Sequence, residues 1–98
     1  MENNENMQSY FDMTDEVAQG TYSNLAVISH SSSEFILDFV RIVPGVRKGN
    51  VKSRVIMTPE HAKRLLFALQ ENIVKYENMF GEIRIPQTIP FPTVQGEA

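Results

Sequence analysis

The sequence predicts an α+β domain. A three-stranded antiparallel β-meander precedes one long C-terminal α-helix (βββα), and two copies are expected to pair into a larger sheet. Two observations predict this fold. Three segments rich in β-branched and aromatic residues are separated by turn-forming segments, and an apolar pattern with helical spacing follows them. With 98 residues, of which 42% are hydrophobic, the chain has enough apolar side chains for one small core.

The three predicted strands follow one another in the first two thirds of the chain. The first covers 21–29 (TYSNLAVIS) and the second covers 34–43 (EFILDFVRIV), with a polar turn at 30–33 between them. The second strand has apolar residues on both faces, which indicates that both sides of the sheet are covered. The third strand, 51–57 (VKSRVIM), follows a loop that begins with Pro-Gly at 44–45.

The long helix is predicted for 59–80, because the residue preferences of helix ends are met on both sides. Thr58 is a good N-cap, Pro59 suits the first turn, and Gly81 provides a C-terminal stop. We interpret the segment from Thr58 to His61 as a capping structure in preference to a catalytic acid and base. This interpretation predicts that Thr58 stabilises the start of the helix without taking part in ligand binding.

An apolar stripe runs along the predicted helix at spacings of three and four residues and is expected to face the sheet. It consists of Ala62, Leu66, Leu69, Ile73, Tyr76 and Phe80. At 1.5 Å per residue the helix is roughly 33 Å long, more than three short strands cover, so a second copy of the chain is expected to pack on it. Phe67 and Val74 lie off the stripe, seven residues apart. The predicted oligomer interface comprises Leu66, Phe67, Leu69, Ile73, Val74, Tyr76 and Phe80.

Charge is distributed unevenly along the chain, although the net charge is only -3. Residues 1–20 carry five acidic side chains and no basic one, whereas 41–64 carry seven basic side chains and one acidic. We predict a disordered acidic arm at 1–18, the βββα domain at 19–82, and an extended Pro-rich tail at 83–98. The apolar residues of the tail are a candidate contact for a protein partner.

The basic middle of the chain contains a candidate anion or nucleic-acid patch. Its residues are Arg41, Arg47, Lys48, Lys52 and Arg54. Three interpretations remain open: charges that protect a solvated sheet face or edge, a surface neutralised by the acidic arm or by a partner subunit, and a nucleic-acid-binding surface. Asp38 is expected to form an ion pair across the sheet with Arg54 or Arg41.

No enzyme site can be assembled from the residues of one chain. The absence of cysteine excludes disulfides and thiolate chemistry, and two histidines are too few for a His-rich metal site. Glu34 and Asp38 would lie roughly 13 Å apart along a strand, beyond the carboxylate separations of glycosidases. The motifs of serine hydrolases and P-loop proteins are missing. We predict a protein that is not an enzyme and has no cofactor, with a site shared between two subunits as the remaining alternative.

The sequence predicts neither a signal peptide nor a membrane span. Its start is acidic, and its longest apolar runs are four to five residues, against the roughly 20 that a spanning helix needs. The expected location is cytoplasmic.

A series of short motifs occurs in order along the chain. They are Tyr22-Ser23-Asn24, Ser33-Glu34-Phe35, Leu37-Asp38-Phe39, Val51-Lys52-Ser53-Arg54, Met57-Thr58-Pro59-Glu60-His61-Ala62-Lys63, Leu65-Leu66, Asn72, Tyr76-Glu77 and Phe80-Gly81. In this combination the sequence resembles a family of short bacterial and archaeal proteins, the domain of unknown function 3467, over about residues 19–85. The acidic arm and the Pro-rich tail are expected to lie outside the resemblance. It implies a compact domain of three strands and a helix, and it implies no activity.

The function we expect is that of a non-enzymatic, homo-oligomeric binding or adaptor module, most simply a homodimer. Two alternatives remain open. The first is a nucleic-acid-binding regulatory protein that uses the basic patch. The second is a chaperone, because the order of strands and long helix is also similar to the export chaperones of the SecB type, a likeness of fold only.

Overall fold

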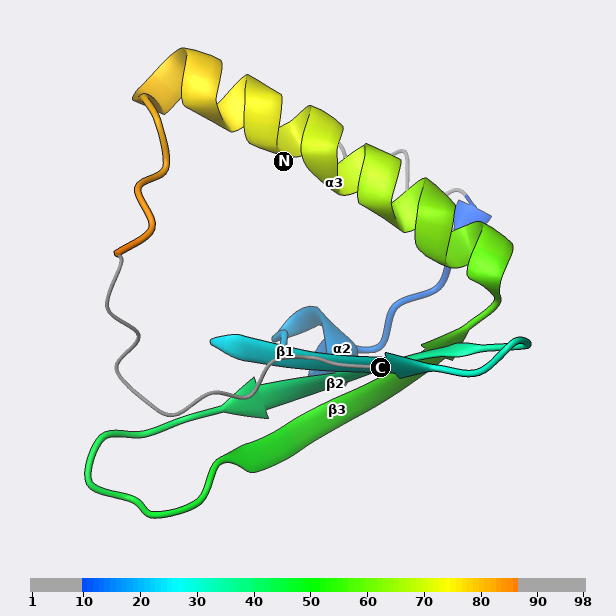
Figure 1. Cartoon of the computed structure of the whole chain (residues 1–98), viewed down its shortest axis with the longest axis vertical. Helices are drawn as coiled ribbons and strands as arrows, with labels where there is room; N and C mark the ends of the chain where they lie inside the picture. The colour runs from blue at the N-terminus through cyan, green and yellow to red at the C-terminus, as the bar shows by residue number, and fades with distance from the viewer. Residues whose placement is uncertain (1–9, 87–98) are drawn as a thin grey trace.

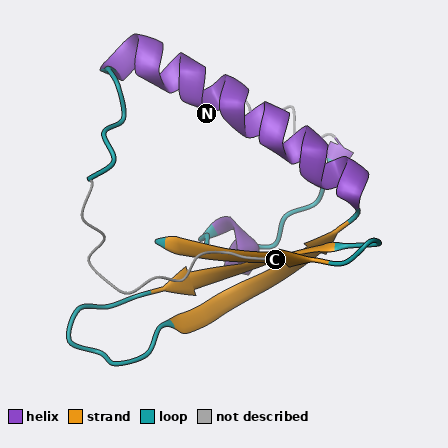
Figure 2. Ribbon diagram, viewed as in Figure 1, coloured by secondary structure: helices purple, strands orange, loops and turns teal. Residues whose placement is uncertain are grey.

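The strands form one antiparallel sheet in the order β1-β2-β3. The computed structural model describes residues 10–86. Strand β1 covers Leu25–His30, β2 covers Phe35–Arg41, and β3 covers Asn50–Met57 (Figures 1 and 2). Helix α3 follows them over Pro59–Phe80. The predicted meander followed by one long helix is therefore confirmed.

Strand β1 begins four residues later than the sequence predicted. At this end the side chain of Asn24, and not the backbone alone, forms the hydrogen bonds to the neighbouring chain segment. Asn24 Nδ2 donates a hydrogen bond to the carbonyl oxygen of Ile42 at 3.0 Å, and Ile42 N donates one to Asn24 Oδ1 at 2.9 Å. Asn24 N also donates to the carbonyl oxygen of Val40 at 3.0 Å. Asn24 thus connects the start of β1 to the end of β2.

A short helix that the sequence did not predict, α2, covers Asp15–Ala18. Thr14 caps it, since its Oγ1 accepts a hydrogen bond from Val17 N at 3.1 Å. This helix lies in the segment that was predicted as an acidic arm. The rest of that arm, residues 1–9, lies outside the described residues, as do residues 87–98 of the predicted Pro-rich tail.

The strand register shows which side chains share each face of the sheet, and both faces carry apolar residues. Ile28 pairs with Leu37, which pairs in turn with Val55, so these three side chains share the face turned toward α3. We call this the helix-side face. Its residues are Ala26, Ile28, Phe35, Leu37, Phe39, Val55 and Met57. The opposite face carries Leu25, Val27, Ile36, Asp38, Val40, Arg54 and Ile56. A register shift between Phe39 and Val40 interrupts the pairing of β2 with β3.

Local capping determines both ends of α3, as the sequence predicted. Thr58 Oγ1 accepts a hydrogen bond from His61 N at 3.2 Å. At the other end Gly81 adopts a φ of 102°, a value that favours glycine, and its N–H donates to the carbonyl oxygen of Glu77 at 2.9 Å. The Glu77 side chain then accepts a hydrogen bond from Ile83 N at 3.0 Å. Local hydrogen bonds therefore mark both ends of the helix.

Helix α3 does not close onto the sheet. It leaves the end of β3 and diverges from the sheet along its length (Figure 1). No residue of α3 is buried. Among the described residues only Leu37 and Val40 are buried, one on each face of β2. The expectation of a compact domain, in which sheet and helix cover each other, is thus not met by a single copy of the chain.

Candidate binding surface

A hollow of about 560 Å³ lies between the helix-side face and the first half of α3. Its lining is almost wholly apolar, and Lys63 is the one charged residue in it. The lining residues are Ala26, Ile28, Phe35, Leu37, Phe39, Met57, Ala62, Lys63, Leu65, Leu66 and Leu69. All three strands and the helix therefore contribute, and we call this space the central hollow.

The apolar stripe of α3 enters the central hollow only with its first half. Leu66 and Leu69 line it, whereas Ile73, Tyr76 and Phe80 do not. The rings of Tyr76 and Phe80 lie 4.9 Å apart between centroids and pack on each other. The second half of the stripe thus extends beyond the lining of the central hollow, and each of these three residues is exposed.

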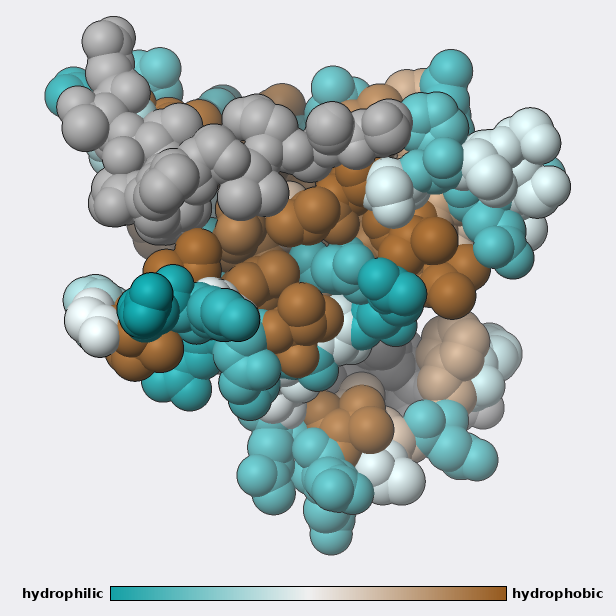
Figure 3. Space-filling view, turned by 60° about the horizontal axis from the view of Figure 1, so that its bottom comes forward, coloured by the Kyte–Doolittle hydropathy of each residue, from teal (hydrophilic) through white to brown (hydrophobic). Residues whose placement is uncertain are grey.

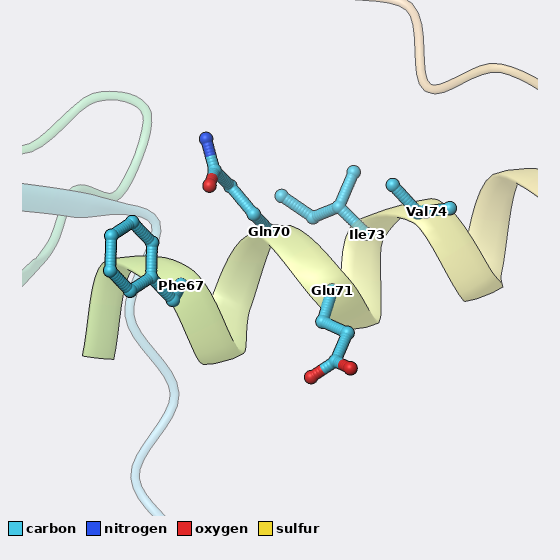
Figure 4. Close-up of a pocket in the computed structure, with 5 residues that line it drawn as sticks. All are labelled: Phe67, Gln70, Glu71, Ile73 and Val74. Carbon is cyan, nitrogen blue, oxygen red and sulfur yellow. The ribbon is translucent and has the colours of Figure 1, made fainter. Parts of the chain in front are cut away.

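A second, shallower hollow of about 640 Å³ lies on another side of the same helix. Phe67, Gln70, Ile73 and Val74 project on one side in Figure 4, while Glu71 points the opposite way. Helix α3 therefore presents apolar groups in two directions. All seven residues of the predicted oligomer interface lie on this helix, and all seven are exposed in the single chain. The predicted interface therefore stays a prediction.

Arg54 and Asp38 form the ion pair that the sequence predicted. Arg54 Nε donates to Asp38 Oδ1 at 2.7 Å and Nη2 donates to Oδ2 at 3.0 Å, so the pair is bidentate. The Asp38 side chain is 16% exposed and the Arg54 side chain 61%. The hydrogen bond from Arg54 lowers the pKa of Asp38, and the one to Asp38 raises the pKa of Arg54. Arg54 is thus already engaged within the sheet.

The other four residues of the predicted basic patch lie near one end of the sheet. Arg41 ends β2 and stands opposite Asn50 in the register. Arg47 and Lys48 lie in the loop between β2 and β3, and Lys52 lies near the start of β3. All four are exposed. The structure therefore brings four of the five cations to one end of the sheet, and the fifth, Arg54, is paired with Asp38.

The two edges of the sheet differ in charge, a feature that the sequence patterns did not reveal. Strand β1 (LAVISH) contains no Asp, Glu, Lys or Arg, no proline and no glycine, and His30 is its one titratable residue, whereas β3 (NVKSRVIM) contains Lys52 and Arg54. The sequence already contains this contrast. Its meaning depends on which strands lie at the edges, and only the strand order shows that β1 and β3 do.

Apolar residues are prominent on the outer surface as well. The space-filling view shows hydrophobic groups exposed among hydrophilic ones across the face that it presents (Figure 3).

No three His, Asp or Glu side chains within residues 10–86 are placed to hold a metal ion. In the same part of the chain, no helix combines the length and the apolar character needed to cross a membrane.

A model of one known family matches the chain over residues 1–85. The match extends further than the sequence motifs indicated, because it includes the acidic segment at 1–18 that was expected to lie outside. No curated protein and no solved structure matches the chain. Since the family match covers most of the 98 residues, the chain belongs to the family described as Protein of unknown function (DUF3467).

Proposed function

We propose that this protein is a non-enzymatic binding module that works as a homodimer, in which two copies join their sheets into a larger one. One observation carries the proposal. The helix-side face and the apolar stripe of α3 line a hollow without covering each other, and α3 has no buried residue. A soluble chain with so much apolar surface left open is typical of one half of an assembly.

The exposed apolar area of α3 has the size that a stable dimer requires. Nine large apolar side chains of this helix are exposed by 38% to 74%. With an aromatic side chain contributing 150–250 Å² when fully buried, nine large side chains at about half exposure offer roughly 800 Å² per chain. Each partner of a standard specific interface buries about 800 Å². The exposed apolar area of the helix, spread over two of its sides, thus has the magnitude of one partner's share in a homodimer.

Sedimentation of two charge variants tests this proposal. Ile73→Glu places a carboxylate on the apolar stripe, and we expect it to shift the protein from dimer to monomer, because a charge would be buried without a partner. Lys75→Glu also places a carboxylate on this helix, on the side opposite the stripe, and serves as the control. The control is expected to remain a dimer. A monomeric wild-type protein, or equal behaviour of the two variants, contradicts the proposal.

A chaperone function is a second candidate, because the central hollow is wide and its lining is almost free of charge. Such a surface fits the apolar segments of an unfolded protein. This candidate predicts that the protein suppresses the aggregation of a thermally unfolded client, and that Leu66→Glu, inside the hollow, abolishes the effect. Unchanged client aggregation in the presence of excess wild-type protein excludes it.

Nucleic-acid binding is a third candidate, supported by the four exposed cations at one end of the sheet. The ion pairs among the described residues join Arg54 to Asp38 and Arg64 to Glu60, so the four are not neutralised there. This candidate predicts retention on DNA or RNA that weakens steeply with salt. Replacing Arg47 and Lys48 together by alanine should weaken retention, and salt-independent or absent retention of the wild type excludes the candidate.

A further inference from the structure

The two edges of the sheet differ in how they are protected against pairing with another strand. An edge strand exposes a row of unpaired backbone N–H and C=O groups, which proteins commonly protect with charged side chains and with bulges. Strand β3 has both kinds of protection, because it contains Lys52 and Arg54 and its pairing with β2 is shifted at Phe39 and Val40. Strand β1 has no Asp, Glu, Lys or Arg and no shift along its pairing with β2, and His30 at its end is the one titratable residue on this edge.

The hydrogen-bond pattern identifies which β1 residues face the open edge. In an antiparallel pair, hydrogen-bonded and non-hydrogen-bonded residue pairs alternate. Ser31 N donates to the carbonyl oxygen of Glu34 at 2.9 Å, so the adjacent pair, His30 with Phe35, is of the second kind. His30, Ile28 and Ala26 therefore direct their backbone groups away from β2. No hydrogen bond from another described segment reaches these backbone groups.

We propose that a second copy of this chain pairs with the β1 edge, antiparallel to β1, so that two chains form one continuous six-stranded sheet. This inference rests on the proposed homodimer and adds the edge at which the chains join. Each residue whose backbone groups face the open edge must stand opposite another such residue of the second copy, and Ala26, Ile28 and His30 all have even numbers. The numbers of two paired residues therefore add up to an even number, so the two-fold axis passes through a residue and not between two. An axis at Val27 or Ile28 keeps most of β1 paired.

The geometry of such a sheet explains the open hollow of the single chain. A two-fold axis perpendicular to the sheet keeps both helix-side faces on the same side. Ala26 and Ile28, which line the central hollow, would then lie next to the corresponding residues of the second copy. The two hollows become one groove with an α3 from each chain above it, and the roughly 800 Å² of exposed apolar area on each α3 matches one partner's share of a standard interface.

Single cysteines test the edge directly, because the chain has none of its own. Opposite residues in an antiparallel pair have Cα atoms about 4.5–5.5 Å apart, within the range that a disulfide bridges. We expect either Val27→Cys or Ile28→Cys to give a covalent dimer under mild oxidation. The matched control is Ile56→Cys, which is at an outward-facing position of the β3 edge and should remain uncrosslinked.

A proline pair provides a second, non-covalent measurement. Ile28→Pro and Ile56→Pro each remove one outward-facing N–H without removing a bond to β2. We expect Ile28→Pro to raise the dimer dissociation constant about tenfold or more and Ile56→Pro to leave it nearly unchanged. If the wild type is a dimer, but Ile56→Cys forms the disulfide and Ile56→Pro raises the dissociation constant, then the chains join at the β3 edge. In that case the proposed β1 edge is wrong and the homodimer stands. If the wild type is a monomer, both proposals fail.

Discussion

The Arg54 guanidinium donates two hydrogen bonds to the Asp38 carboxylate, at 2.7 Å and 3.0 Å, on the face of the sheet opposite α3. The register places the two residues directly across from each other on β2 and β3. The two side chains therefore meet across neighbouring strands, and the bidentate ion pair joins β2 to β3 by a side-chain bond in addition to the backbone ladder.

This ion pair predicts how stability depends on pH. The hydrogen bond from Arg54 lowers the pKa of Asp38 in the folded protein, so the unfolded chain binds a proton more readily. The contribution of Asp38 to stability is thus fully present above its ordinary pKa of 3.8 and is lost as the pH falls through its lowered pKa. We expect Asp38→Asn to lower the melting temperature at neutral pH, and the difference from the wild type to shrink in strong acid.

Glu60→Gln is the matched control for the Asp38 variant. It removes the same charge from the pair of Arg64 with Glu60, whose side chains are 70% and 75% exposed. Such an exposed pair contributes little to stability, so its loss should leave the melting temperature almost unchanged. An equal effect of the two substitutions would contradict the structural role given to the pair of Asp38 with Arg54.

The N-cap of α3 predicts a measurable loss of stability. Thr58→Ala removes the oxygen that accepts the hydrogen bond from His61 N, and we expect it to cost about 1 kcal/mol. That loss corresponds to a melting temperature lower by about 4–8 °C for a domain of this size. Thr58→Ser keeps the hydroxyl and should retain most of the stability. A Thr58→Ala protein with an unchanged melting temperature would show that capping is not the role of Thr58.

Asn24 predicts a graded effect at the start of β1. Asn24→Ala removes both side-chain hydrogen bonds to Ile42, and we expect a loss of about 1 kcal/mol because water replaces part of this exposed pair. Asn24→Asp keeps the acceptor for Ile42 N and loses only the donor, so its loss should be smaller. Chemical denaturation of the three proteins checks this order, and a larger loss in Asn24→Asp would contradict it.

The second half of α3 predicts a link between stability and concentration. Phe80 is 67% exposed in the single chain, so truncating it should cost little stability in a monomer. In a homodimer the wild-type melting temperature rises with protein concentration, and Phe80→Ala should weaken that rise. A melting temperature independent of concentration for both proteins would show that Phe80 contributes to no interface.

The parts of the fold that the sequence predicted are those that depend on local chemistry. Thr58 and Gly81 cap α3 through bonds to residues three and four positions away, which spacing alone reveals. The strand start at Leu25 depends on the bond of Asn24 to Ile42, eighteen positions away, so strand propensity at 21–24 was misleading. Helix α2 has only four residues, too few for an apolar period to appear.

The candidate surface was predicted in part. The helical stripe was expected to face the sheet, and Leu66 and Leu69 do line the central hollow with it, but both stay exposed. The open central hollow was not predicted, since the angle between α3 and the sheet depends on packing between distant elements and, in our proposal, on a second chain. The role of β1 as the unprotected edge also required the strand order, although the absence of Asp, Glu, Lys and Arg from LAVISH is visible in the sequence.

The molar mass of the full-length wild-type protein tests the central claim most directly. Light scattering coupled to size exclusion, at micromolar concentration and physiological salt, measures it without reference to shape. The homodimer predicts twice the chain mass of 11.2 kDa, falling toward the chain mass when Ile73 on the α3 stripe is replaced by glutamate. A mass of 11.2 kDa at every concentration would contradict the account, because the helix-side face and α3 would then remain uncovered in solution.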